Sequence, residues 1–141
     1  GHLVLSTLHT TNASQSVNRI LDFFKADERE QIRRQLAGTL QAVICQRMTL
    51  TVEGKVTPAQ EILINSPIVR KMLEENRLDK LPAAIETGGD DGMINFNQAL
   101  FNLVKTGKVT EKEALAKASN PQALEMNFKG IFLDEARRIL T

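Results

Sequence analysis

The chain has 141 residues, 42% of them apolar and 25% charged, a composition typical of a globular domain with one hydrophobic core. Its 18 lysines and arginines against 17 aspartates and glutamates leave a formal net charge of +1, which gives no electrostatic attraction toward nucleic acid. No apolar run approaches the ~20 residues of a transmembrane segment and no signal peptide is recognisable, so we expect a cytoplasmic protein.

The first ten residues, Gly1 to Thr10, form an apolar run that becomes polar toward its end. This pattern predicts a buried parallel strand whose C-terminal end presents Thr7, His9 and Thr10 to a crevice. Open α/β sheets bind ligands at that end of their strands. Because such a strand needs sheet partners that we do not expect within this chain, we interpret the chain as the back half of a larger α/β, nucleotide-handling domain.

The two histidines lie at either end of this predicted strand. Side chains alternate along a strand, so His2 and His9 would point to opposite faces about 23 Å apart and cannot share a metal ion. We expect no metal site. For His9 two interpretations stay open: a hydrogen-bonded histidine at a strand end, or a group that touches a phosphate or an attacking water. We expect His2, at the very terminus, to be a packing residue or to be disordered.

Two amphipathic helices are predicted next. Asn12 and Gln15 have the spacing of a capping box and begin a helix over residues 13–24. Acidic residues at the start of the second helix, from residue 27, favour its positive end. Its apolar stripe consists of Ile32, Leu36, Leu40, Val43 and Ile44, and the arginines outside that stripe are Arg29, Arg33 and Arg34.

An antiparallel hairpin is predicted after residue 47. Apolar and polar residues alternate over 48–52, Glu53-Gly54 suits a tight turn, and residues 56–64 form a second extended run. Pro58 fits only an edge or a bulge of that second strand. Cys45, the single cysteine, can form no internal disulfide and is expected to be a reduced core residue.

From residue 66 the pattern is helical. The predicted helices begin at the capping residues Ser66, Asn95, Thr110 and Asn120, with a short additional helix over 79–87 and an optional last helix over 131–140. The segment 88–92 lacks the alternating ligands of a calcium loop and is interpreted as a mobile connector. Two regions follow: 1–64, with the strand, two helices and hairpin, and a helical region over 65–141.

A phosphate-binding loop is missing. Gly54-Lys55 and Gly107-Lys108 are the Gly-Lys pairs present, but each is followed by valine and neither has the upstream glycine that a P-loop needs. No convincing nucleophile with a neighbouring base is found either. We therefore expect no ATP binding to this chain alone through such a loop.

Residues 1–11, GHLVLSTLHTT, closely resemble the histidine box of the type II/IV secretion ATPases, most closely that of the twitching-motility, or type IV pilus retraction, ATPases. Further stretches agree with that family in order along nearly the whole chain. They are residues 17–20 with Phe24, 42–47, 58–62, 85–88, and 92–93 with Phe96 and Leu100.

Residues 67–75 are similar to the signature helix that the retraction ATPases require for retraction beyond ATP hydrolysis. The residues that keep its chemistry are Val69, Arg70, Met72, Leu73 and Glu75. Lys71 stands where the family has asparagine, and Glu74 where it has arginine, which reverses one charge.

The resemblance implies the C-terminal portion of a RecA-like domain, with one core strand and a β-hairpin, followed by a mostly helical C-terminal region. The full-length protein would be a hexameric motor that uses ATP and Mg²⁺ to disassemble type IV pili. It would be cytoplasmic, peripheral to the inner membrane at the pilus base, with platform proteins as partners.

The family's P-loop, acidic boxes and catalytic glutamate precede the histidine box, so the resemblance implies neither ATP nor Mg²⁺ bound to this chain alone and no activity of its own. It places His9 at the nucleotide, makes His2 the second family histidine, and puts Thr7 and Thr10 near the phosphates. The isolated chain should self-associate or rearrange its N-terminus, because its strand has lost its sheet. The alternative is a non-enzymatic helical protein-interaction module.

Overall fold

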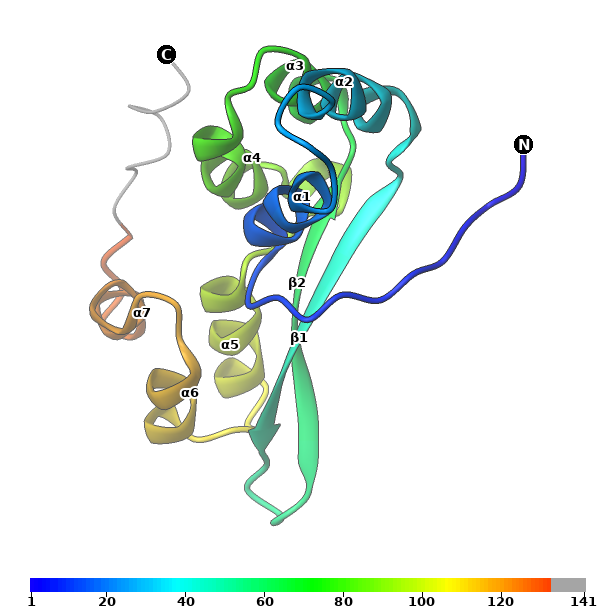
Figure 1. Ribbon diagram of the computed structural model, residues 1–141. Helices are drawn as coiled ribbons and strands as arrows, with labels where there is room; N and C mark the ends of the chain where they lie inside the picture. The colour runs from blue at the N-terminus through cyan, green and yellow to red at the C-terminus, as the bar shows by residue number, and fades with distance from the viewer. Residues whose placement is uncertain (133–141) are drawn as a thin grey trace.

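A long β-hairpin with helices on one of its faces organises the computed structural model, which describes residues 1–132 (Figure 1). Strands β1 (Ala42–Leu50) and β2 (Val56–Ile64) pair antiparallel, with Ala42 opposite Ile64 and Leu50 opposite Val56. The α-helices are α1 (Ala13–Asp22), α2 (Arg29–Thr39), α3 (Pro67–Glu74), α4 (Leu81–Thr87), α5 (Phe96–Lys105), α6 (Glu111–Lys117) and α7 (Pro121–Phe128). The short 3-10 helices are η1 (Leu78–Lys80) and η2 (Gly89–Asp91).

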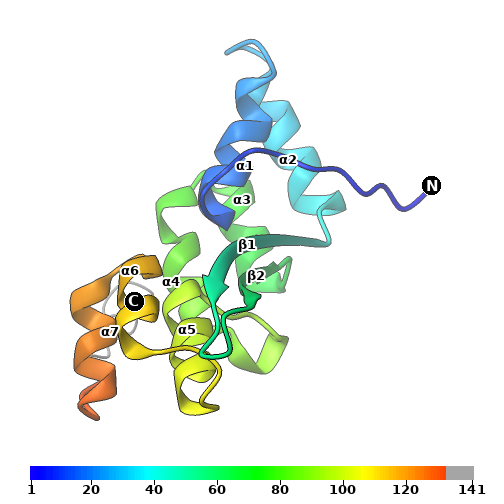
Figure 2. The same ribbon diagram turned by 90° about the horizontal axis from the view of Figure 1, so that it is seen from below.

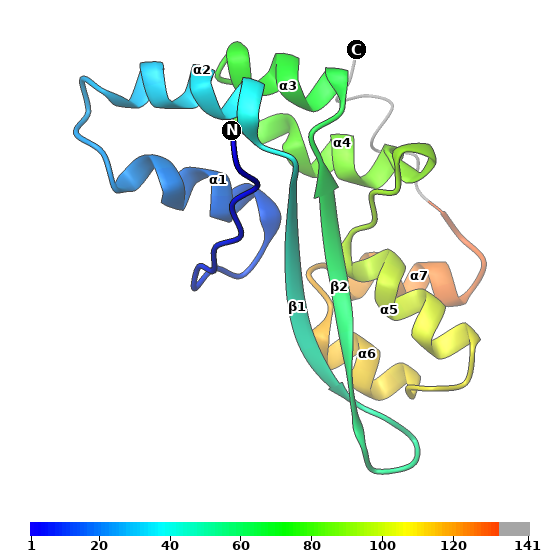
Figure 3. The same ribbon diagram turned by 90° about the vertical axis from the view of Figure 1, so that its right-hand side faces the viewer.

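The helices gather in two groups along the hairpin. Helices α1, α2 and α3 lie toward one end, whereas α5, α6 and α7 lie toward the other (Figures 2 and 3). Helices α1, α4 and α5 pack on β2, and α1 and α6 on β1. The largest fully buried apolar side chains are Phe96, Leu63, Leu73, Leu81, Ile85, Leu100 and Leu124. They belong to one core that includes residues from both predicted regions.

The hairpin buries one face only. Cys45, Ala59 and Leu63 are buried on the helix side, whereas Ile44 and Val56 are exposed on the opposite side. Pro58 lies opposite Met48 in regular register, so its missing N–H is placed on an open edge, as predicted. None of the helices described is long and apolar enough to cross a bilayer.

The buried strand predicted at the N-terminus is not formed. Residues 1–10 are extended, carry no strand pairing and run away from the body of the protein (Figure 1). Leu3 is 77% exposed and Leu5 88%. The only sheet in the described residues is the hairpin, which does not pair with this segment. A strand alone cannot satisfy its backbone groups or bury its side chains, so the prediction of burial is wrong for this chain.

The second helix is shorter than predicted. It ends at Thr39, because Leu40 already has an extended backbone, and Val43 and Ile44 belong to β1. The predicted helical stripe includes Val43 and Ile44, but β-branched residues at alternating depth suit a strand. The hairpin accordingly begins at Ala42, six residues before the predicted alternation.

Most helix starts are confirmed. The cap side chains of Asn12, Ser66, Asn95, Thr110 and Asn120 each accept a hydrogen bond from the backbone N–H three residues on. At Thr110 the cap is not reciprocated, because the Glu113 carboxylate accepts from the backbone N–H of Leu50.

The segment 88–92, expected to be a mobile connector, contains the 3-10 turn η2. Gly88 is buried, and a Cβ there would lie 2.7 Å from the carbonyl oxygen of Ala84. Gly92 closes η2 with a left-handed backbone, φ 85°. The optional helix over 131–140 falls, apart from its first two positions, outside the described residues.

Candidate functional site

The end of the histidine box is fixed to the first turn of α1. The Thr10 hydroxyl lies 2.6 Å from the Ser16 hydroxyl. The backbone N–H and the hydroxyl of Thr11 both donate to the Gln15 side-chain oxygen, at 2.7 and 2.8 Å. His9, immediately before these residues, is exposed. Side-chain hydrogen bonds therefore fix the chain directly after His9, whereas none fixes it before His9 in the described structure.

The remaining predicted residues of the box are not brought together. His2 and Thr7 are exposed like His9, and none of the three makes a side-chain hydrogen bond in the described structure. Over residues 1–132, no three histidines, cysteines or acidic residues lie close enough to hold a metal ion. Thr10 alone among the predicted nucleotide-side residues has a defined place.

Glu61 is a buried carboxylate that the sequence interpretation did not single out. It is only 7% exposed, and its Oε1 accepts from the backbone N–H of Ala13 at 2.9 Å. Its Oε2 accepts from the backbone N–H of Phe96 at 3.4 Å. These are the first residues of α1 and α5, so one negative charge lies at the positive ends of two helices. Glu61 thereby joins the segment after the histidine box to the C-terminal helices.

Arg47 makes a second connection between the same parts. Its guanidinium carbon lies 3.8 Å from the centre of the Phe96 ring, a close cation–π contact. The group also donates to the backbone carbonyl of Lys117, the last residue of α6, at 2.8 Å and to that of Thr11 at 3.3 Å. Arg47 belongs to the stretch 42–47, and the resemblance of that stretch to the secretion ATPases is the one feature of the sequence that pointed to it.

Cys45 is a free, buried thiol, as predicted. Burial is the largest cause that raises its pKa, and the nearby Glu61 charge adds to it, whereas the Ser16 hydroxyl and Arg47 act in the opposite direction. A raised pKa keeps the thiol protonated near neutral pH, so Cys45 is no nucleophile here.

Helix α3 forms as predicted, with Ser66 as its cap and Pro67 in the first position. Its inner face buries Val69, Met72 and Leu73 completely or nearly so. The outer side carries exposed Arg70 and Glu75. Lys71 and Glu75 form an ion pair at 3.9 Å, whereas no ion pair joins Arg70 and Glu74 in the described structure.

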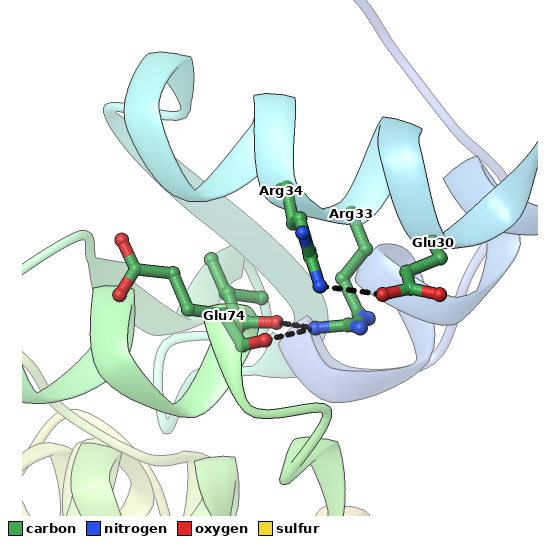
Figure 4. Close-up of polar contacts among 5 residues, drawn as sticks. Glu30, Arg33, Arg34 and Glu74 are labelled. Atoms are coloured by element: carbon green, nitrogen blue, oxygen red, sulfur yellow. Dashed lines mark hydrogen bonds and ion pairs between the residues drawn. The ribbon is translucent and has the colours of Figure 1, made fainter.

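Arg33 ties α2 to this helix. Although outside the predicted apolar stripe, it is only 8% exposed. Its Nη1 donates to the backbone carbonyl of Leu73 and, at 2.6 Å, to that of Glu74 (Figure 4). Both carbonyls belong to the last turn of α3, where a cation is favoured.

Among the described residues, a cavity of about 510 Å³ lies beside the end of the histidine box. The N-caps of three helices, Asn12, Asn95 and Asn120, line it together with Glu61 and Phe96. Its wall is therefore built from the same junction that Glu61 and Arg47 hold together.

The class of this protein is defined by a β-hairpin that is covered by helices and preceded by the histidine box, whose end is anchored to α1. The chain belongs to the type II/IV secretion system protein family, which matches residues 1–126. It is 37% identical over 122 residues to the type IV pilus retraction ATPase PilT of Pseudomonas aeruginosa, covering 86% of this chain and 36% of that protein. It is 39% identical over 125 residues to the twitching motility protein of Neisseria gonorrhoeae, covering 88% and 33%.

The fold agrees with these relatives. The crystal structure of the pilus retraction motor PilT with bound ADP superimposes with a TM-score of 0.78 at 34% identity, over 89% of this chain and 35% of that one. The chain thus spans about a third of the length of the relatives it matches. This kinship does not favour the alternative of a non-enzymatic helical interaction module.

Proposed function

We propose that the chain is the C-terminal part of a motor ATPase that couples ATP hydrolysis to type IV pilus retraction. The observation that carries this proposal is the combined likeness in sequence and fold to PilT, whose solved structure holds ADP. Residues 1–64 would complete a RecA-like core, and residues 65–141 would form the helical region that bears the retraction-type helix α3.

In this proposal His9 contacts the nucleotide phosphates, with Thr7 and Thr10 nearby and His2 as the second histidine of the box. The anchor at Thr10 and Thr11 supports this placement, because it leaves residues 1–9 free to pair with a neighbouring strand. The chain has no P-loop sequence, so ATP and Mg²⁺ would be held mainly by groups outside it. Hydrolysis would therefore belong to the full-length protein and not to this chain alone.

The full-length protein would act as a hexamer in the cytoplasm, at the inner-membrane base of the pilus, against platform proteins. The outer side of α3 is suited to such contact. Ile68 is 45% exposed, and Arg70 has neither an ion pair nor a side-chain hydrogen bond in the described structure. An exposed apolar residue and an unpaired cation are each available to a partner surface.

The test is ATP hydrolysis by the full-length protein with His9→Ala. We expect turnover to fall about 10²-fold, the usual effect of losing one group that stabilises charge in the transition state. Thermal unfolding should stay unchanged, because His9 is exposed. Lys25→Ala, an exposed loop change, is the matched control. Wild-type turnover in a folded His9→Ala protein would remove the assignment.

A further inference from the structure

Helices α2 and α3 pack against each other, and both lie at the same end of the hairpin (Figure 3). They run in opposite directions, because Arg33, in the first half of α2, reaches the end of α3, whereas the residue before the α3 cap reaches the end of α2. The C-terminal carbonyls of α3 thus lie close to a polar side chain of α2, and those of α2 lie close to the side chain of Asn65, just before α3.

Both ends are closed in this reciprocal way. At one end, Arg33 donates to the carbonyls of Leu73 and Glu74 (Figure 4). At the other, the Asn65 side-chain amide donates to the carbonyls of Ala37 at 3.0 Å and Leu40 at 2.8 Å. Helix ends leave their last carbonyls without partners inside the helix, so these four bonds meet needs that α2 and α3 cannot meet themselves.

The Arg33 end is the more constraining of the two. The side chain is buried, and no carboxylate in the described structure lies within ion-pair distance of it. Its neighbour Arg34, by contrast, is exposed and pairs with Glu30 at 2.6 Å (Figure 4). A buried cation without partners is strongly unfavourable. The last turn of α3 therefore cannot leave α2 without leaving this charge unsatisfied.

Helix α2 is in turn linked to α1. Arg29, the first residue of α2, lies 3.5 Å from the Asp22 carboxylate at the end of α1 and donates to the carbonyl of Phe24 at 3.1 Å. A chain of polar contacts thus runs from α1, which follows the histidine box, through α2 to the end of α3.

We propose that Arg33 is the positioning residue that locks α3 to α2, so that α3 moves with the α1–α2 segment as one body. This inference rests on the proposed function, in which that segment follows the nucleotide-sensing strand and α3 serves retraction. Arg33 touches neither nucleotide nor pilus; it sets where α3 stands. Asn65 holds the opposite end of the pair.

The experiment compares Arg33→Met with Arg34→Met in the full-length protein. Methionine keeps the apolar stem of Arg33 and removes the donor. Amide hydrogen exchange at residues 73–77 should be about tenfold faster in Arg33→Met, the loss expected for a charge-assisted bond, and unchanged in Arg34→Met. ATP turnover should stay within about twofold in both variants, whereas pilus retraction should fall about tenfold in Arg33→Met alone.

Arg33→Lys should restore retraction in part, because one nitrogen serves both carbonyls and an ammonium can donate to both. It also covers the case in which Arg33→Met fails to fold. Asn65→Ala should reproduce the separation of retraction from turnover. Unchanged exchange at residues 73–77 would overturn the lock. A parallel fall of turnover and retraction would overturn the positioning role, and a wild-type protein without ATP turnover would instead overturn the proposed function.

Discussion

The histidine box and helix α3 are both short segments that resemble family motifs, yet only α3 forms regular secondary structure. Residues 1–7 and His9 are exposed, and none of residues 1–9 pairs in a strand, whereas α3 buries Val69, Met72 and Leu73 and has both ends capped. A helix makes its backbone hydrogen bonds within itself, whereas a strand takes them from its neighbours. The two motifs therefore differ in what they require: α3 needs a surface to pack on, and the box needs a sheet.

The tests of this difference use the isolated 141-residue chain, and the largest compares Phe96→Ala with Leu5→Ala. Phe96 is 1% exposed, so its truncation should lower the free energy of unfolding by about 3–5 kcal/mol. Leu5 contributes to no core, and its truncation should change the free energy by under about 0.5 kcal/mol. Urea unfolding of each variant measures both values. A comparable loss in Leu5→Ala would mean that the box is packed in solution.

A second test concerns the connection that Glu61 makes between the segment after the histidine box and the C-terminal helices. Glu61→Gln places an amide donor against a backbone N–H of α1 or α5 and should cost about 1–3 kcal/mol. Glu53→Gln, at the exposed hairpin turn, is the control and should be nearly neutral. Equal unfolding midpoints for the two variants would show that Glu61 does not hold the helices together.

Removing a helix cap gives a smaller effect. Ser66→Ala should destabilise the protein by about 1 kcal/mol, because the hydroxyl caps α3 at the backbone N–H of Val69. Thr7→Ala removes a hydroxyl of the same kind from the unpaired box and should leave the free energy of unfolding unchanged. If Thr7→Ala costs as much as Ser66→Ala, the contrast between the two motifs fails.

The smallest effect is one of pH. Burial raises the pKa of Cys45, so the unfolded chain ionises this thiol at a lower pH than the folded protein does. The contribution to stability is complete below the ordinary thiol pKa and declines as pH rises from there toward the raised value. As the pH rises above about 8.5, the ordinary thiol pKa, Cys45→Ala should therefore lose less stability than the wild type. An identical decline in both proteins would contradict the raised pKa.

Local signals in the sequence predicted much of the fold. The Asn, Ser and Thr caps and the spacing of apolar residues in α3 and α5 depend on neighbours within four residues, and the structure confirms them. The burial of residues 1–10 was wrong because it depends on a sheet that this chain does not supply. The second helix was too long because an apolar run of valine and isoleucine fits either element.

Sequence reasoning did not find two buried charged residues, Arg33 and Glu61, for a related reason. Arg33 and Glu61 are charged, and a charged residue is expected at the surface unless a partner is known. Their partners are backbone groups 35–48 residues away along the chain, which no local pattern reveals. Of the two, only Glu61 carried a hint, because it lies two residues from Ala59 and two from Leu63 and so shares their buried face of β2.

The most direct measurement is a structure of the full-length protein with a bound ATP analogue. We predict that residues 3–8 pair as an inner strand and that the His9 ring lies within hydrogen-bonding distance of a phosphate oxygen. Residues 3–8 left exposed, or a His9 ring turned away from the phosphates, would contradict the role given to the histidine box.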